Sequence, residues 1–317
     1  MTIYDTNLFR PVAGFMGLSS PTIKSTEPPL ACIVGIPFDC GTHPFRVGSR
    51  QGPDSIREQS RLIRPYEVIN RFGIDNPSAF LRAVDVGNVA CHPGDTAATY
   101  PAIEQAILDI LELGAIPISL GGDGAVTLPQ LRSVSKHYPD FVVLHIDSHT
   151  DTYSIPGYNT ATTFTRAAEE KLLNVSNSFH VGTRGGSFMP GVLDFGRNVG
   201  YNIISFDDFS QNISGTIDNI KKQIGSKPVY LCFDMDVFDP SCAPGVCTPE
   251  WGGLLAREGL TLLRQLCGLN FVAFDINTVS PPHDVQGMTA FLAATVVQEF
   301  FSLAAVAIKT YPKDRLI

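Results

Sequence analysis

Short runs of apolar and β-branched residues recur along the whole chain, and most are continuous rather than alternating with polar residues. Each run has the length of one strand, and a continuous apolar run is typical of a strand buried on both faces of a sheet. We predict strands at residues 31–37, 81–86, 116–120, 141–147, 178–182, 201–206, 229–236 and 271–277.

Between several of these runs lie segments whose apolar residues follow a helical period. The clearest are residues 103–113, 255–266 and 290–303. Alternation of strands and helices predicts a parallel sheet with helices on both faces. Because no repeat, low-complexity tract or linker interrupts the chain, we expect one α/β domain over residues 1–317. We expect residues 1–30 to be an extension that packs on the domain or on a neighbouring subunit.

Acidic residues follow two of the predicted strands at a spacing of two. One strand leads into Asp147, His149 and Asp151, and another delivers Asp234 and Asp236. In an extended backbone, residues two apart point to the same side. Ligands of parallel sheets bind beyond the carboxyl ends of the strands. If the two strands are neighbours, four carboxylates and one imidazole meet in a small volume.

Such a cluster of acidic groups predicts a metal site. Carboxylates at contact distance ionise together only when cations offset their repulsion. Oxygen ligands with one imidazole suit Mn²⁺, Ni²⁺ or Fe²⁺ better than a structural zinc held by thiolates. Two such ions about 3.5–4 Å apart would activate a bridging water for attack on a carbon atom.

Other polar residues near these motifs have ordinary structural explanations. A lone aspartate after a strand more often forms a turn or caps a helix than binds a ligand, and we interpret Asp123, Asp239 and Asp275 in this way. His145 lies inside an apolar run, so we interpret it as a core histidine with satisfied nitrogens.

The composition narrows the classes of function. With 44% hydrophobic residues the chain is globular, and a net charge of -8 argues against nucleic acid or an anionic membrane surface as its main partner. No apolar run approaches the length of about 18 residues that predicts a membrane span. The first residues lack a signal-peptide pattern, so we expect a cytoplasmic protein. Seven widely spaced cysteines without a CxxC pair argue against a disulfide framework and a structural zinc.

Several motifs together resemble the ureohydrolase family of arginases and agmatinases, and most of all its agmatinase-like branch. They are LGGDG, HIDSHTDTY, CFDMDVFDPSCAPG, TPEWGGL and VSPPHDVQGMTAFLAA, which begin at residues 120, 145, 232, 248 and 279. The resemblance implies a three-layer α-β-α fold around an eight-stranded parallel sheet. It also implies hydrolysis of guanidino compounds, a Mn²⁺ or Ni²⁺ centre, and assembly into trimers or hexamers.

Carried over by position, the resemblance assigns roles to the acidic cluster. Asp147 and Asp234 would bridge two metal ions. His149 and Asp236 would complete one metal site, and Asp151 would belong to the other.

Three positions depart from the family pattern. Gly124 stands where the family has the histidine of the second metal site, Thr160 where it has a proton-transfer histidine, and Thr278 where it has a glutamate facing the guanidinium. Lost metal partners cost about 10–100-fold in affinity, and a lost general acid or base costs about 10²–10⁴-fold in rate. We therefore name no catalytic residue, and keep Thr160 and Thr278 as candidates for substrate binding.

These losses favour a degenerate subunit that supports an intact homologue in a hetero-oligomer. Such an arrangement resembles metformin hydrolase, a two-subunit, nickel-dependent member of the family. One alternative is an active hydrolase of a substituted or neutral amidine that uses the intact site, with one metal ion per chain. Another is a protein that binds small amidines, and a supporting subunit is also compatible with no metal.

Overall fold

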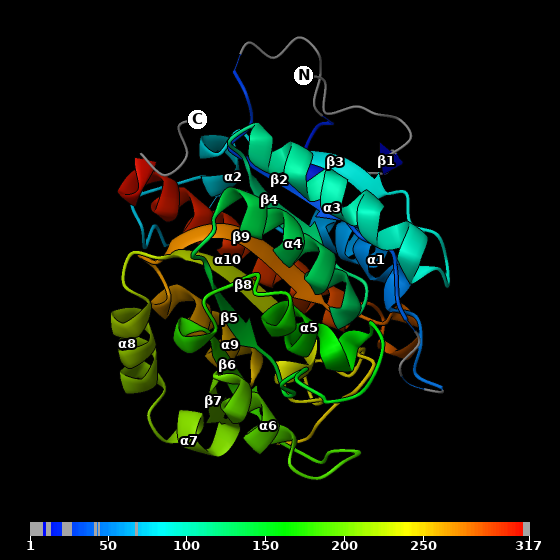
Figure 1. Cartoon of the computed structure of the whole chain (residues 1–317). Helices are drawn as coiled ribbons and strands as arrows, with labels where there is room; N and C mark the ends of the chain where they lie inside the picture. The colour runs from blue at the N-terminus through cyan, green and yellow to red at the C-terminus, as the bar shows by residue number, and fades with distance from the viewer. Residues whose placement is uncertain are drawn as a thin grey trace.

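The computed structural model describes residues 9–10, 14–20, 27–40, 43, 45–66 and 69–312. Within these residues, eight parallel strands form one sheet, as predicted, and a two-residue strand joins its edge antiparallel (Figure 1). The order across the sheet is β1-β3-β2-β4-β9-β8-β5-β6-β7. The strands are β1 (Phe9–Arg10), β2 (Ala31–Gly35), β3 (Val84–Val89), β4 (Ile116–Leu120), β5 (Val142–Ile146), β6 (Phe179–Thr183), β7 (Asn202–Ser205), β8 (Pro228–Asp234) and β9 (Asn270–Asn277).

Helices cover both faces of the sheet, which confirms the three-layer α-β-α fold. One apolar core joins the sheet to α1, α7, α8, α9 and α10, and a second joins its other face to α3, α4 and α5 (Figure 1). The helices are α1 (Gly52–Gln59), α2 (Pro77–Phe80), α3 (Thr96–Glu112), α4 (Thr127–His137), α5 (Thr163–Glu169), α6 (Val192–Val199), α7 (Phe206–Gln211), α8 (Ile213–Ile224), α9 (Ala256–Gln265) and α10 (Met288–Thr310).

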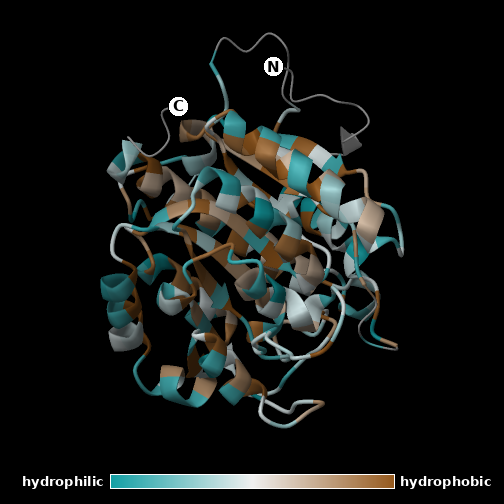
Figure 2. Ribbon diagram, viewed as in Figure 1, coloured by the Kyte–Doolittle hydropathy of each residue, from teal (hydrophilic) through white to brown (hydrophobic). Residues whose placement is uncertain are grey.

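The apolar runs become buried strands because both of their faces are covered. All residues of β2, β4, β5 and β9 are buried, and Figure 2 shows hydrophobic ribbon through the middle of the molecule. The helical period of α3 places Ile103, Ile107 and Ile110 in the core, as the sequence predicts.

Several element boundaries differ from the predictions because local polar contacts decide them. The strand predicted at 81–86 is β3, and it starts three residues later because Leu81 caps α2. The polar residues Asp85 and Asn88 belong to this strand because the buried guanidinium of Arg57 donates hydrogen bonds to both. The helix predicted at 103–113 begins earlier, where the Asp95 side chain caps α3.

Helix α10 has the length and apolar character of a membrane span, with a mean hydropathy of 1.9 over its most apolar window. However, 61% of that window is buried inside the protein, where α10 packs against β9, α1 and α9. This is the environment of a core helix.

The predicted extension, residues 1–30, lies largely outside the described residues. Within its described part, Phe15 is buried and its ring lies 6.0 Å from that of Phe301 in α10. The backbone N–H of Phe15 donates a hydrogen bond to the Asp85 carboxylate.

Candidate metal centre

The acidic cluster lies beyond the carboxyl ends of the central strands. The neighbours β4, β9, β8 and β5 end side by side, although β5 and β8 are far apart in sequence. Asp147 follows β5, Asp234 ends β8, and Gly124 lies in the turn after β4. The sheet order thus brings together the two acidic motifs, as the metal-site hypothesis requires.

Asp147, His149 and Asp236 form the first group of candidate ligands. Nδ1 of His149 lies 3.0 Å from Oδ2 of Asp236 and 3.4 Å from Oδ1 of Asp147. The Ser148 hydroxyl and the Thr248 hydroxyl donate hydrogen bonds of 2.7 Å and 3.1 Å to the Asp236 carboxylate. Nδ1 of the imidazole therefore faces the carboxylates and is positioned to bind a cation with them.

A second group contains His145, Asp147 and Asp151, whose ligand atoms lie within 4.8 Å of one another. All three residues are buried. Asp151 has a φ of 51°, and Asp236 lies in a short 3-10 turn rather than in the strand. The expectation of a continuous extended backbone is therefore wrong for both motifs. The side chains converge because the chain turns after each strand.

Crowding of these acids disfavours their simultaneous ionisation. Burial and the neighbouring carboxylates of Asp236 and Asp147 raise the pKa of Asp234 well above its usual value. Burial and Asp147 likewise raise the pKa of Asp151. For His149, burial opposes the charged form, but attraction to Asp236 and Asp147 and hydrogen bonds to both carboxylates together outweigh burial and raise the pKa. Buried carboxylates with an imidazole are a donor set that fits a divalent cation such as Mn²⁺ or Ni²⁺.

A cavity of about 340 Å³ opens beside the acids. Its remaining lining is largely apolar or uncharged, and none of the described lining residues is a lysine or arginine. These residues are His43, Tyr153, Ile155, Asn159, Thr160, Ala161, Phe188, Met189 and Thr248. The cavity therefore combines an acidic floor with a wall suited to small apolar substituents.

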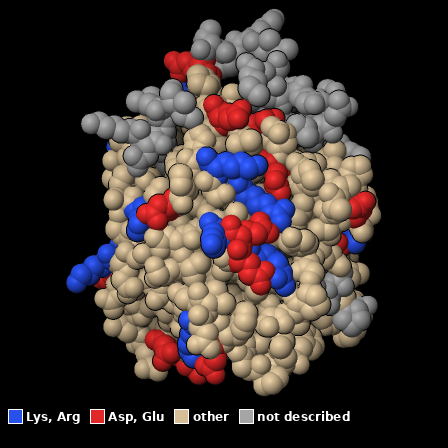
Figure 3. Space-filling view, in the orientation of Figure 1, with Lys and Arg blue, Asp and Glu red and all other residues tan. Residues whose placement is uncertain are grey.

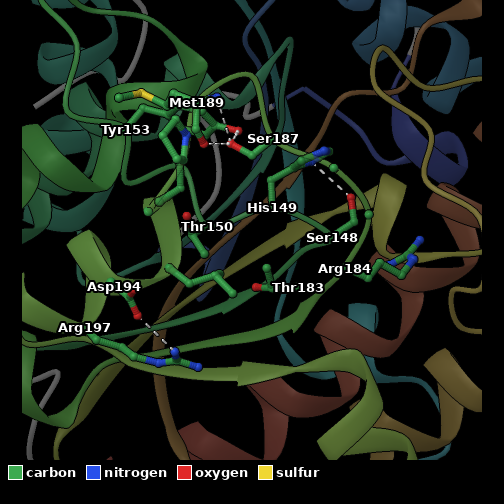
Figure 4. A pocket seen from close by; sticks show the side chains of 16 residues that line it. Ser148, His149, Thr150, Tyr153, Thr183, Arg184, Ser187, Met189, Asp194 and Arg197 are labelled. Atoms are coloured by element: carbon green, nitrogen blue, oxygen red, sulfur yellow. Dashed lines mark hydrogen bonds and ion pairs between the residues drawn. The ribbon is translucent and has the colours of Figure 1, made fainter.

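A neighbouring cavity of about 410 Å³ shares His149, Tyr153 and Met189 with the first and is shown in Figure 4. The Arg184 guanidinium beside it donates hydrogen bonds to the backbone carbonyls of Asp236, Phe238 and Glu250, among others. Arg184 thus holds two loops together rather than offering a free charge.

The other arginine of this neighbouring cavity is Arg197, which forms an ion pair of 3.6 Å with Asp194 (Figure 4). The loop at 185–190 also contributes to the lining of this cavity.

Two of the three departures from the family pattern lie in contact. A Cβ atom added to Gly124 would lie 2.9 Å from Cγ2 of Thr160 and 3.0 Å from Oδ2 of Asp151. Thr160 lines the acidic cavity. Its buried hydroxyl faces the Asp123 carboxyl, but no hydrogen bond of ordinary geometry satisfies it. A side chain at position 124 would therefore lie next to the Asp151 carboxylate and could bind the same cation as Asp151.

Thr278 is buried and acts on a carboxylate rather than on the cavity. Its hydroxyl donates a hydrogen bond to Oδ1 of Asp234, and its backbone N–H donates to the Gly122 carbonyl. Its φ of 68° is unusual for a β-branched residue. Thr278 is absent from the described lining of the cavity, whereas Thr160 belongs to it.

Asp123 and Asp239 have the cap and turn roles interpreted for them, but Asp275 does not, because it lies inside β9 and its buried carboxyl accepts hydrogen bonds from side chains. The Asp123 side chain caps a short 3-10 helix, Asp239 accepts three backbone hydrogen bonds, and Asp275 accepts from Thr127 and Tyr230. None of the seven cysteines, all of which lie among the described residues, forms a disulfide.

His145 is buried and both of its ring nitrogens have hydrogen-bonding partners, as expected of a core histidine, but the identity of these partners is unexpected. They are the candidate ligand Asp147 and a second histidine, His180 of β6. The sequence reasoning missed His180 because only the pairing of β5 with β6 places it opposite His145.

Comparison with known proteins decides the family. The sequence profile described as the Arginase family matches residues 30–302. The chain belongs to the arginase family. It is 35% identical over 278 residues to guanidinopropionase of Pseudomonas aeruginosa, and the match covers 86% of each chain. It is 33% identical to the mitochondrial agmatinase of Gallus gallus, with 92% of this chain and 85% of that protein covered.

A solved arginase-family structure agrees with these relatives. The proclavaminate amidinohydrolase of Streptomyces clavuligerus superimposes with a TM-score of 0.87 and 33% identity, covering 94% of this chain and 99% of that one. The resemblance to the agmatinase-like branch and the arginase-like fold are thereby confirmed.

Proposed function

We propose that the chain is the supporting, non-catalytic subunit of an amidinohydrolase complex in the cytoplasm. Its partner would be an intact homologue that depends on Ni²⁺ or Mn²⁺ and releases urea or a ureide from a guanidino or biguanide compound. A metformin-hydrolase-like pair is the specific form of this proposal. Trimeric or hexameric assembly, through copies of this chain and its partner, belongs to the same proposal.

The observation that carries the proposal is the position of the three departures beside the acidic cluster, next to Asp151 and Asp234. Gly124 and Thr160 lie in contact beside Asp151, and neither supplies an imidazole. Thr278 presents a hydroxyl to Asp234 where the family would present a carboxylate to a guanidinium. A bound metal would supply an activated water, but no described group stands at these positions to transfer the proton or to balance the guanidinium charge.

The test is to purify this chain alone, its homologous neighbour alone, and the two together, and to measure urea release from guanidino and biguanide compounds. We expect hydrolysis only where the intact homologue is present, and the highest rate with both chains. Vigorous hydrolysis by this chain alone would sink the proposal.

A second candidate is an active hydrolase of a substituted or neutral amidine. The complete set Asp147, His149, Asp234 and Asp236 supports one metal ion, and the apolar cavity wall without lysine or arginine supports an uncharged substituent. Measurement of the metal content per chain tests this candidate, because the active hydrolase needs one ion per chain, whereas a supporting subunit works with one ion or none. A chain without metal would therefore exclude the active hydrolase.

A third candidate, a protein that binds small amidines, rests on the same cavity. Calorimetry with a matched pair, propylguanidine and 3-guanidinopropionate, tests it. We expect the alkyl compound to bind more tightly, since no described lysine or arginine of the lining is available for a carboxylate. Equal or tighter binding of the acid, or no heat with either compound, would count against this candidate.

A further inference from the structure

Two buried histidines and one candidate metal ligand form a continuous chain of hydrogen bonds. Nε2 of His145 lies 2.8 Å from Oδ2 of Asp147, and Nδ1 of His145 lies 2.8 Å from Nδ1 of His180. The two rings come from directly paired positions of β5 and β6. They are 1% and 0% exposed, so no bulk water competes for these contacts.

The contacts determine where the protons lie. A carboxylate oxygen only accepts hydrogen bonds, so Nε2 of His145 carries a proton and donates to Asp147. In the neutral ring, Nδ1 is then bare and accepts. For a hydrogen bond between the two Nδ1 atoms, Nδ1 of His180 must therefore carry the proton and donate it to Nδ1 of His145. Nε2 of His180 then carries no proton.

The surroundings of His180 agree with this assignment. Its Nε2 is buried without a hydrogen-bond partner among the described residues. Its ring packs at 4.8 Å from Phe164 and 4.6 Å from Tyr201, both in edge-to-face geometry. An aromatic enclosure of this kind holds the ring in one orientation and keeps its Nδ1 directed at His145.

The effect of the chain falls on Asp147. Its Oδ2 accepts from His145, and its Oδ1 accepts from the backbone N–H of His149. Each oxygen retains a second lone pair, and the carboxylate is held so that these lone pairs are available to a cation. Partners of this kind behind a ligand fix its orientation and raise its affinity for metal.

We propose that His145 and His180 are a positioning pair for a divalent cation at Asp147. His180 fixes the tautomer of His145, and His145 fixes the carboxylate of Asp147. The proposal rests on the metal site of the proposed function, but it concerns two residues for which the sequence pattern predicts no functional role.

The first experiment measures Mn²⁺ affinity by calorimetry in the full-length protein. His145→Gln keeps an N–H donor near the position of Nε2, whereas His145→Leu removes it. We expect His145→Leu to weaken Mn²⁺ binding by about 10–100-fold and His145→Gln to restore most of the affinity. His137→Leu on α4 is the matched control, because His137 lies outside both ligand groups. Unchanged affinity in a folded His145→Leu protein would overturn the proposal.

The second experiment keeps the test decisive if His145→Leu fails to fold. Nitrogen NMR of the wild-type protein with labelled histidine reports which ring nitrogen of each residue carries the proton. We expect Nε2–H at His145 and Nδ1–H at His180, both unchanged by Zn²⁺, a diamagnetic probe. Loss of the His145 Nε2 proton on adding Zn²⁺ would mean direct ligation and would overturn the positioning role.

Absence of Mn²⁺ binding by the wild-type chain would also overturn the positioning role. The supporting-subunit proposal would survive that result, because it is tested separately by urea release with the homologous partner.

Discussion

At the residue scale, Gly124 lies where a side chain would enter the space between Asp151 and Thr160. A histidine at this position would have to fit between Asp151 and Thr160, because a Cβ at residue 124 would lie 3.0 Å and 2.9 Å from their side chains, closer than ordinary van der Waals contact. Loss of the imidazole and the identity of residue 160 are therefore coupled, which the sequence by itself does not reveal.

This coupling predicts how the site responds to repair. Gly124→His alone should raise metal content only weakly, because Cγ2 of Thr160 obstructs the new side chain. Gly124→His with Thr160→Ser, which removes that methyl group, should raise it further. Metal content after dialysis measures both effects. If neither variant changes it, the positional assignment of Gly124 is wrong.

Adding the other family residues extends the same prediction. The variant Gly124→His, Thr160→His, Thr278→Glu should show measurable guanidine hydrolysis if, as proposed, the three departures make this chain non-catalytic. Metal content of the same preparation shows whether the site has filled. A metal-loaded triple variant without any activity would mean that further residues are missing.

Thr278 allows a test of the hydroxyl that holds Asp234. Thr278→Val removes the donor and leaves the buried carboxylate with one fewer hydrogen bond, at a cost of about 1–3 kcal/mol in the free energy of unfolding. Thr278→Ser keeps the donor and removes the β-branch that is strained at a φ of 68°. Urea denaturation in the presence of EDTA should therefore rank serine at or above wild type and valine below it. Equal stability of the two variants would contradict this role of the hydroxyl.

At the scale of elements, the strands were predictable because a short, continuous apolar run is typical of a strand that is buried on both faces of a parallel sheet. Strand β3 shows the limit, since its polar residues Asp85 and Asn88 are buried only because Arg57 arrives from α1. Short helices such as α6 and α7 were missed because their few turns hold too little periodic pattern.

Helix α9 offers a test of packing between elements. A Cβ on Gly259 would lie 2.2 Å from the ring of Phe238, so Gly259→Ala should destabilise the protein by about 1–3 kcal/mol through overpacking. Gly186→Ala, which meets nothing within 4 Å, is the control. The midpoint of urea denaturation compares the two variants. Similar midpoints would show that α9 moves to accommodate the added methyl group without loss of stability.

At the scale of the whole molecule, the net charge of -8 divides into surface and site. Acidic and basic side chains gather together over the middle of the face shown in Figure 3. Arg132 of α4 pairs with Glu104 of α3 and with Glu170, which follows α5. The opposite charges of such ion pairs offset one another at the surface. Among the described residues, the ion pairs of the buried acids of the site are with histidines rather than with lysine or arginine, so a bound cation would change the stability of the whole protein.

This dependence can be measured by thermal unfolding. Mn²⁺ at 100 times its dissociation constant should stabilise the folded state by about 2.7 kcal/mol relative to protein in EDTA. Asp236→Asn, which removes one candidate ligand charge, should abolish most of the difference in Tm. A wild-type Tm that does not respond to Mn²⁺ or Ni²⁺ would indicate a chain without a working metal site.

The sequence by itself determined the sheet, the family motifs and the five residues of the acidic cluster, because apolar periodicity and motif spacing are properties of neighbouring residues. Only the tertiary structure decided that Gly124 touches Thr160, that Thr278 serves Asp234, and that His180 supports His145. Each of these contacts joins residues from different strands or loops. Their partners depend on the order of strands in the sheet, which linear spacing does not encode.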